Sequence, residues 1–238
     1  MSSNEGEFKR QKADGIMGLN RNKASFWNQM HAAGAINSKQ FSLCVRKFPY
    51  VPIKQKMIGA MTLGGVDERL NSSEMKYMDL EKNGLTGMFP VQIRKIHVHA
   101  EGGSRLSGSN PDIDLRSTKI SLATDDATVL NSKSVILDSG TTDSILPIAL
   151  KPAFDKVWKE LMGISFPSEA VELSVEELKK WPTILFQMKG SETNANGFDK
   201  QNPKDILVAF PPSSYMRLDL VKKMYEPSLT MKVDVEVR

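Results

Sequence analysis

The sequence predicts an all-β architecture, mainly β with a few short helices. Short apolar segments rich in Val, Ile, Leu and Phe recur along the 238 residues and are bounded by Gly, Pro and Asn, as strands are. Helical periodicity is confined to a few short stretches, so the pattern favours sheets over alternating β-α units. With 40% hydrophobic and 25% charged residues, the composition is that of a chain that folds into a globular structure.

The expected elements follow in chain order. A short helix is expected over residues 24–33, and strands are expected over 41–45, 91–98 and 135–137. The clearest alternation lies near the end, over 229–237, where apolar side chains occupy every second position. That pattern predicts a half-buried strand.

Two further helices carry local end signals. The first follows Pro152, and Gly163 is placed to end it. The second starts after Ser174, which has Glu177 three residues on, the spacing of a capping box. The first helix also carries an apolar stripe that is expected to pack in the core, formed by Phe154, Val157, Trp158 and Leu161.

Polar stretches and net charge limit the possible partners. Residues 101–114 and 189–205 contain Gly and Pro among polar residues and are expected to be surface loops. The net charge is +4, with no Lys/Arg run interleaved with aromatics, so no nucleic-acid partner is expected. The best uncharged stretch, 206–216, contains two prolines and is shorter than the ~18 apolar residues of a membrane-spanning helix.

Cysteine and histidine give no metal motif. Cys44 stands alone, and three histidines leave no zinc-finger spacing. His97 and His99 would share one side of the expected strand 91–98, but no third ligand accompanies them, so both are expected to be surface or rim histidines. We therefore expect no metal site and no other cofactor. No Gly-x-Ser-x-Gly elbow and no phosphate loop is present either.

The most specific string in the sequence lies at residues 135–142 and reads VILDSGTT. In this string Asp138 directly follows an apolar run and lies in an expected tight turn that is rich in hydroxyl side chains. Asp, Ser and Gly are common turn residues, so one interpretation is a plain strand followed by a turn. The two threonines after the glycine make the string much rarer by chance than Asp-Ser-Gly alone.

This string resembles the second catalytic motif of the pepsin-type aspartic endopeptidases. Residues 13–19, ADGIMGL, are similar to the Asp-Gly-Ile element that closes the N-terminal lobe of that family. FSLCV at 41–45 and LGGVD at 63–67 resemble its crossover into the C-terminal lobe. Residues 91–98 and 181–186 resemble the strands before and after the catalytic turn. The matches occur in the order of the family and span roughly residues 13–216.

The resemblance implies a pepsin-like acid protease fold and an aspartic-type endopeptidase, a hydrolase that acts on peptide or protein substrates. In that family two aspartates, one from each lobe, share a proton and a water molecule, so that one is the general base and the other the general acid. Asp138 would supply one carboxylate. The catalytic loop would be supported by Ser139, Gly140 and Thr141, and the substrate cleft would be bordered by Thr142, Asp143 and Phe89.

The resemblance is incomplete. Asp138 is the one aspartate in the sequence that is followed by Ser or Thr and then Gly, and the family's flap and last strands have no counterpart. We therefore expect residues 1–67 to be a remnant of the N-terminal lobe with the interlobe crossover, and 68–238 to be a C-terminal lobe without its last strands. With one carboxylate, the isolated chain is expected to be inactive.

Three explanations of the gap stay open: a truncated gene model or fragment of a full protease, a non-catalytic remnant, and a half-enzyme that dimerises. Symmetry argues against the dimer, because two copies would duplicate pieces of both lobes without supplying a flap. The alternative function is a non-catalytic module that binds extended peptide by strand addition. A missing N-terminal lobe is a further expected partner. The family is usually secretory, vacuolar or extracellular, whereas residues 1–12 resemble no signal peptide, so the compartment stays open.

Overall fold

The computed structural model describes residues 16–45, 59–71, 73–82, 87–99, 117–120 and 126–232. The chain divides into two compact units, one formed by Met1–Ser73 with Thr86–Met88, the other by Glu74–Leu85 with Phe89–Arg238. Three parts of the expectations above, the loop at 101–114, the first residues of the element at 13–19 and the end of the strand at 229–237, lie outside the described residues.

The first unit contains one helix, one hairpin and one short 3-10 turn among its described residues. The elements are α1 (Phe26–Ala32), β1 (Phe41–Val45), β2 (Gly59–Leu63) and η2 (Glu68–Leu70). β1 and β2 pair antiparallel, with Phe41 opposite Leu63. The buried Trp27 of α1 holds the segment that precedes this helix, because its indole N–H donates to the Leu19 and Asn20 carbonyls at 3.1 and 2.9 Å.

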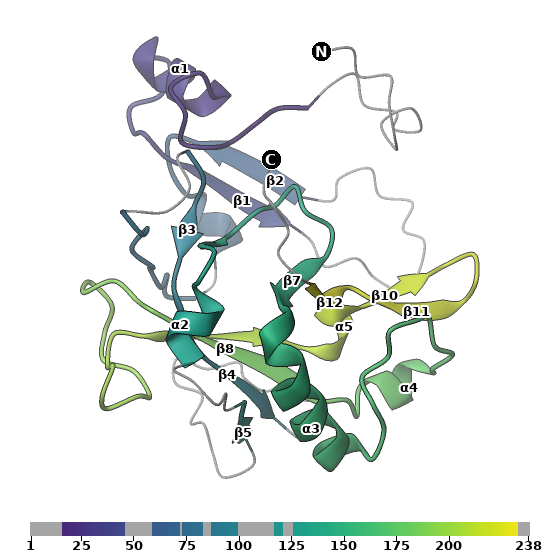
Figure 1. Ribbon diagram of the computed structural model, residues 1–238. Coiled ribbons are helices and arrows are strands. Elements are labelled where there is room, and N and C mark those ends of the chain that lie inside the picture. The colour runs from purple at the N-terminus through teal and green to yellow at the C-terminus, as the bar shows by residue number, and fades with distance from the viewer. Residues whose placement is uncertain are drawn as a thin grey trace. The chain divides into compact units, whose positions relative to one another are not determined.

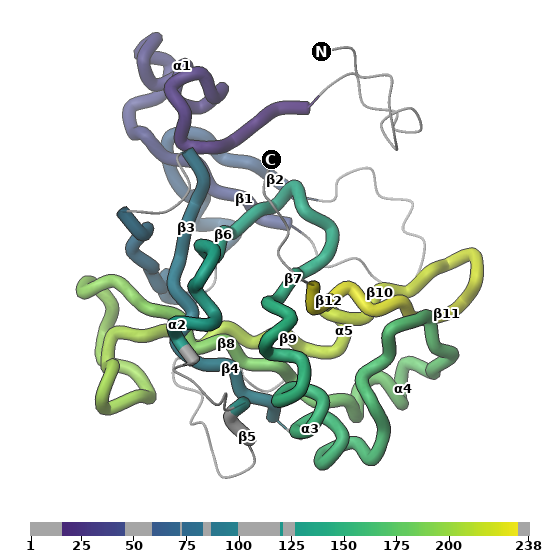
Figure 2. Tube along the Cα trace, in the orientation of Figure 1, coloured from purple at the N-terminus to yellow at the C-terminus, as the bar shows by residue number. Residues whose placement is uncertain are grey.

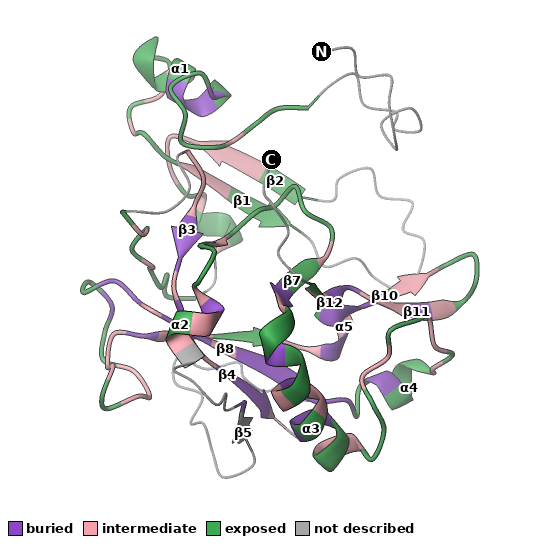
Figure 3. Ribbon diagram, in the orientation of Figure 1, coloured by how far each residue is buried: buried purple, intermediate pink, exposed green. Residues whose placement is uncertain are grey.

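A four-stranded antiparallel sheet dominates the second unit (Figure 1). Its strands are β5 (Ser117–Lys119), β4 (Ile93–His99), β8 (Thr183–Met188) and β9 (Ile206–Phe210), in that spatial order. β4 and β8 lie inside the sheet and carry most of its buried residues, as the purple ribbon in Figure 3 shows. β9 lies at one end of the order and pairs with β8.

Three two-stranded pairs and several short helices complete the described part of this unit. The pairs are β3 (Pro90–Val91) with β6 (Val135–Ile136), β7 (Ser144–Pro147) with β12 (Leu229–Lys232), and β10 (Met216–Asp219) with β11 (Met224–Pro227). The β7–β12 pair is parallel and the other two are antiparallel. The helices are α2 (Asp126–Leu130), η3 (Ile148–Leu150), α3 (Lys151–Met162), α4 (Val175–Leu178) and α5 (Pro212–Tyr215). The mainly β prediction is confirmed.

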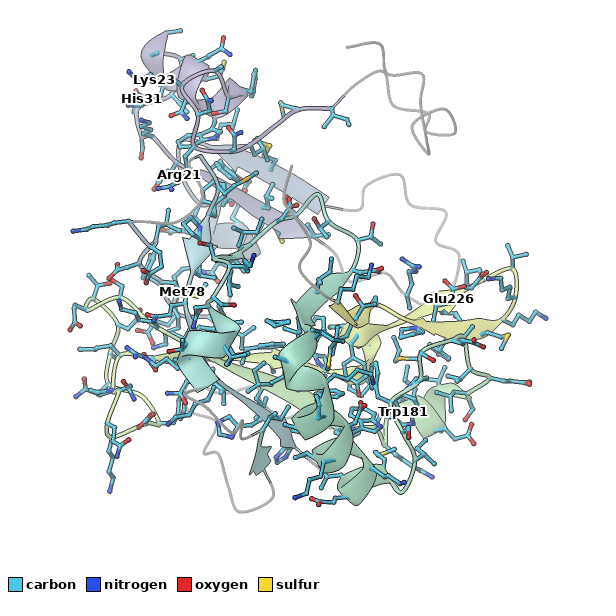
Figure 4. All side chains as sticks on the ribbon, in the orientation of Figure 1. Arg21, Lys23, His31, Met78, Trp181 and Glu226 are labelled. Carbon is cyan, nitrogen blue, oxygen red and sulfur yellow. The ribbon has the colours of Figure 1, made fainter. Side chains whose placement is uncertain are left out.

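The core of the second unit joins α3 to the sheet. Phe154 and Trp158 of α3 are fully buried and belong to one cluster with buried residues of β4 and β8. Trp181, labelled in Figure 4, meets Trp158 edge to face, with ring centroids 5.6 Å apart. The predicted apolar stripe of this helix is therefore confirmed as core packing. No helix in the part of the chain that the structure describes has the length and apolar character needed to cross a membrane.

The two helices with local end signals form as predicted. α3 ends at Gly163, whose φ of 71° lies in the left-handed region that glycine adopts without strain. α4 begins after Ser174, and both hydrogen bonds of the capping box with Glu177 are present. The strand expected at 91–98 is divided: β3 ends at Val91 and β4 starts at Ile93, whose backbone is bonded by the side chain of Asn131.

One expectation about exposure is wrong, and a second holds for only part of its segment. His97 is buried, at 8% exposure, on the inner strand β4, where its neighbours Ile96 and Val98 are buried as well. The loop 189–205 has no helix or strand, yet Asn194 and Asp205 in it are buried. The Asn194 side chain forms hydrogen bonds with the backbone of Tyr77. The carboxylate of Asp205 accepts a hydrogen bond from the side chain of Gln187. Long-range polar contacts therefore draw part of this loop inward.

Candidate active site

The turn that carries Asp138 is held between two paired strands. On its entry side, β6 pairs with β3, and the Leu137 N–H donates to the Phe89 carbonyl at 3.1 Å. On its exit side, β7 pairs with β12, and the Ser144 N–H donates to the Ser228 carbonyl at 2.8 Å. Figure 2 follows the chain from β6 through the turn into β7. Both ends of the turn are thus fixed by residues distant in the sequence.

The Asp138 carboxylate is oriented by its own turn. The Gly140 N–H donates to Oδ1 at 2.9 Å, and the Thr141 hydroxyl donates to Oδ2 in a short hydrogen bond. The Thr141 N–H also donates to the Asp138 carbonyl at 3.3 Å, which closes the turn. A Cβ on Gly140 would lie 3.2 Å from Oδ1, so glycine allows this close approach of backbone to carboxylate.

The same hydrogen bonds set the charge of this carboxylate. The Thr141 hydroxyl, and after it the Gly140 N–H, lower the pKa of Asp138 below its ordinary value, because both donors favour the ionised form. Partial burial opposes this shift but does not outweigh it. Because its pKa is lowered, the exposed carboxylate of Asp138 carries its negative charge in neutral and mildly acidic solution.

The remaining residues expected at the site lie near Asp138 with different surroundings. Ser139 and Thr142 are exposed, and within the described residues the Ser139 hydroxyl does not bond to the carboxylate, unlike that of Thr141. Phe89 is half-buried, and its carbonyl accepts the Leu137 N–H immediately before Asp138. The structure thus brings Phe89 beside the turn although 49 positions separate it from Asp138 in the printed sequence.

Asp143 has an ionic partner that the sequence did not suggest. The guanidinium of Arg217 on β10 lies 3.9 Å from Asp143 Oδ1, and it also pairs with Glu226 of β11 at 3.2 Å. Arg217 therefore links the exit of the turn to the β10–β11 hairpin, whose Glu226 is labelled in Figure 4. No spacing in the sequence connects residue 143 with residue 217, because the contact depends on the arrangement of separate strands.

The site offers acid-base chemistry by a carboxylate. Among the residues that the structure describes, no group of three or more His, Cys, Asp or Glu side chains could hold a metal ion. A single ionised carboxylate, exposed and held by two donors, can accept a proton from water or another weak acid. It cannot by itself supply the proton-donating partner that hydrolysis of an amide also needs.

The fold and the site together define a mainly β chain that presents an exposed carboxylate in a turn between two paired strands. Comparison with known families then gives the particular group. The sequence model of the family described as eukaryotic aspartyl protease matches residues 1–199. The chain belongs to this family of aspartic peptidases, and its mainly β fold agrees with the pepsin-like fold. No curated protein matches the chain.

Proposed function

We propose that this chain contributes one of the two catalytic carboxylates of an aspartic endopeptidase, and that Asp138 is that residue. One observation carries the proposal: the Asp138 carboxylate is held by the Gly140 N–H and the Thr141 hydroxyl in an exposed turn between two paired strands. Membership of the aspartyl protease family supports it, and Asp138 lies within the matched range. Ser139, Gly140 and Thr141 are proposed to support the catalytic loop, and Thr142, Asp143 and Phe89 to border the bound peptide.

The chemistry requires a second carboxylate close to Asp138. Two carboxylates that share a proton have pKa values driven apart, so that one is charged and the other protonated at the same pH. In this chain the donors around Asp138 lower its pKa instead. The residue thus provides a base to activate water, whereas the acid that protonates the leaving amine must come from another aspartate.

We infer that this second aspartate comes from another stretch of polypeptide. Asp138 is followed by Ser-Gly, and no other aspartate in the sequence is followed by Ser or Thr and then Gly. Residues 1–67 are proposed to be the end of an N-terminal lobe with the crossover, and 68–238 to be a C-terminal lobe. On this proposal the 238 residues are a fragment of the enzyme and do not cleave peptides alone.

The first experiment measures cleavage by the purified chain. A mixture of peptides is incubated with the chain across the acidic and neutral range, and products are identified by mass spectrometry. We expect no products from the wild type or from Asp138→Asn. Acid-dependent cleavage that a statine inhibitor blocks and Asp138→Asn abolishes would show that one copy of the motif is sufficient, against the proposal.

The second experiment supplies the missing carboxylate. The genomic sequence upstream of Met1 is read for an Asp-Thr/Ser-Gly loop and a flap tyrosine, and the encoded product is expressed together with this chain. We expect acid-dependent peptide cleavage that Asp138→Asn abolishes. Asp155→Asn is the matched control, because Asp155 lies on the surface of α3 in an ion pair with Lys151 and should leave activity unchanged. Equal activity of both variants would reject Asp138.

A second candidate function is a non-catalytic peptide-binding module. It is favoured by the position of β9, which ends the four-stranded sheet and, among the described strands, pairs with β8 alone. An extended peptide could add to such an edge through main-chain hydrogen bonds. Peptide binding that slows amide exchange in β9, without cleavage in either experiment above, would support this function over proteolysis.

A further inference from the structure

The three residues Asn71-Ser72-Ser73 form an asparagine-x-serine sequence without proline. Asn71 is the one asparagine in the chain that is followed two positions later by Ser or Thr. This pattern is the acceptor sequence for N-linked glycosylation, which requires an accessible asparagine amide and a hydroxyl two residues on. Ser72 lies outside the described residues, and the pattern asks only that its position is not proline.

Asn71 directly follows the 3-10 turn η2 and is arranged as an Asx turn. Its own N–H donates to the Glu68 carbonyl at 3.3 Å, which places it at the end of η2. Its side-chain Oδ1 accepts the Ser73 N–H at 3.4 Å. The amide oxygen is therefore occupied locally, and in the described part of the chain no hydrogen bond holds the Nδ2 nitrogen. This is the atom that would carry a sugar.

Other asparagines in the structure differ in this respect. Asn28, Asn131 and Asn194 each commit their amide nitrogen to a backbone carbonyl, at 2.8, 2.7 and 2.8 Å respectively. Asn28 and Asn194 are also buried. A glycan on any of these nitrogens would break a hydrogen bond that fastens a loop or strand. Asn71 meets no such obstacle.

Asn71 and the residues that follow it are accessible in the structure. Asn71 is partly exposed, and the described residues 73–77 after it are exposed and form no helix or strand. Before Asn71 in the chain, η2 is held by Asp67, whose carboxylate accepts hydrogen bonds from the backbone N–H and the guanidinium of Arg69. The acceptor therefore directly follows a locally fixed turn and precedes a stretch of exposed side chains.

We propose that Asn71 is a site of N-linked glycosylation. In this reaction the Asn71 Nδ2 forms a bond to the anomeric carbon of an oligosaccharide carried on a polyprenyl diphosphate. The nitrogen loses one proton, and the polyprenyl diphosphate leaves with the electrons of the broken sugar–phosphate bond, so nothing is oxidised or reduced. The Ser73 hydroxyl is the group that the transferase recognises. The proposal does not depend on catalysis by Asp138.

The test expresses the full chain behind a cleavable secretory leader in eukaryotic cells. The mass of the product is measured before and after treatment with an N-glycosidase in heavy-oxygen water, which labels each formerly glycosylated asparagine. We expect one glycan, with the label at residue 71. Asn71→Gln and Ser73→Ala should each lose it completely, whereas Ser73→Thr should keep it. Ser73→Ala leaves the asparagine in place and so tests recognition itself.

A matched control within the same unit shows that the chain reaches the transferase. Lys39→Thr places a hydroxyl two positions after Asn37, and both positions are exposed in the structure. In the Asn71→Gln background this variant should carry one glycan, at Asn37. If Lys39→Thr alone is glycosylated at Asn37 while Asn71 remains unmodified, the proposal is wrong. A glycan that persists in Asn71→Gln without Lys39→Thr would also overturn it.

Discussion

Gly190 is the second residue of the loop 189–205, which connects β8 to β9, and its backbone is tightly enclosed. A Cβ added at Gly190 would lie far inside contact distance of the Lys204 carbonyl oxygen and 2.6 Å from the Asn194 Nδ2 atom. The Lys204 group is backbone and cannot rotate away. Gly190→Ala would therefore force the two ends of the loop 189–205 apart.

The loss of stability expected for Gly190→Ala has two sources, overpacking and the disturbance of two hydrogen bonds. Overpacking in a filled interior costs about 1–3 kcal/mol. Separation of the loop ends also removes the Asn194 hydrogen bond to the Lys204 carbonyl, at 3.0 Å, and weakens the 3.4 Å bond from the Gly190 N–H to Asp205. With about 1 kcal/mol for the lost hydrogen bond and up to about 1 kcal/mol for the weakened one, Gly190→Ala should lower the free energy of unfolding of the second unit by about 2–5 kcal/mol.

Amide hydrogen exchange of β8 and β9 measures this loss, because it reports the free energy of opening for the affected strands. The matched control is Gly163→Ala at the end of α3, where nothing lies within 4 Å and only the positive φ of 71° opposes a side chain. That control should cost about 1 kcal/mol. If the amides of β8 are equally protected from exchange in Gly190→Ala and Gly163→Ala, then Gly190 is not enclosed as described.

Two further predictions concern carboxylates. Thr141→Val removes the hydroxyl that bonds to Asp138 and should raise the pKa of Asp138 toward its ordinary value, which carbon-13 NMR of the side-chain carboxyl measures against pH. Asp199→Asn should destabilise the fold most near neutral pH. Burial alone would raise the pKa of Asp199, but hydrogen bonds led by that from Gln187 outweigh it and hold the pKa well below its ordinary range.

Thr142→Val changes an exposed threonine beside Thr141 and should leave the Asp138 titration unchanged; equal shifts in both variants would contradict the role of the Thr141 hydroxyl. Because the folded-state pKa of Asp199 is lowered, its stabilisation is present above the unfolded pKa and is lost as pH falls through the folded pKa. The stability difference from Asp199→Asn should therefore shrink below about pH 4. A stability difference between wild type and Asp199→Asn that does not change with pH would contradict stabilisation by the ionised Asp199 carboxylate.

Local signals in the sequence were sufficient for several elements. Gly163 ends α3 and Ser174 caps α4 because glycine geometry and capping hydrogen bonds involve residues within one helical turn. The strand expected at 41–45 forms with the same bounds, and the polar residues Gln40 and Arg46 flank it in the sequence. The turn at Asp138 is predictable for a similar reason: the motif and the donors that orient this carboxylate lie within four consecutive residues.

Features that depend on distant partners could not be predicted in this way. The polar composition of 189–205 indicates a surface loop, yet Asp205 is buried because Gln187 and Arg94 bond to its carboxylate. The contact between Asp143 and Arg217 likewise arises from the placement of β10 next to the turn. Sequence spacing contains no trace of such pairs, since they are set by how strands stack in three dimensions.

The parallel pairing of β7 with β12 has a consequence for the order in which the protein forms during synthesis. Ser144, next to the proposed catalytic turn, has Leu229 as its strand partner, so the exit of the turn stays unpaired until residue 229 has been translated. Contacts this far apart in sequence form late and slowly. A ribosome that stops before residue 229 would release a chain in which Asp138 is present but the strand after its turn has nothing to pair with.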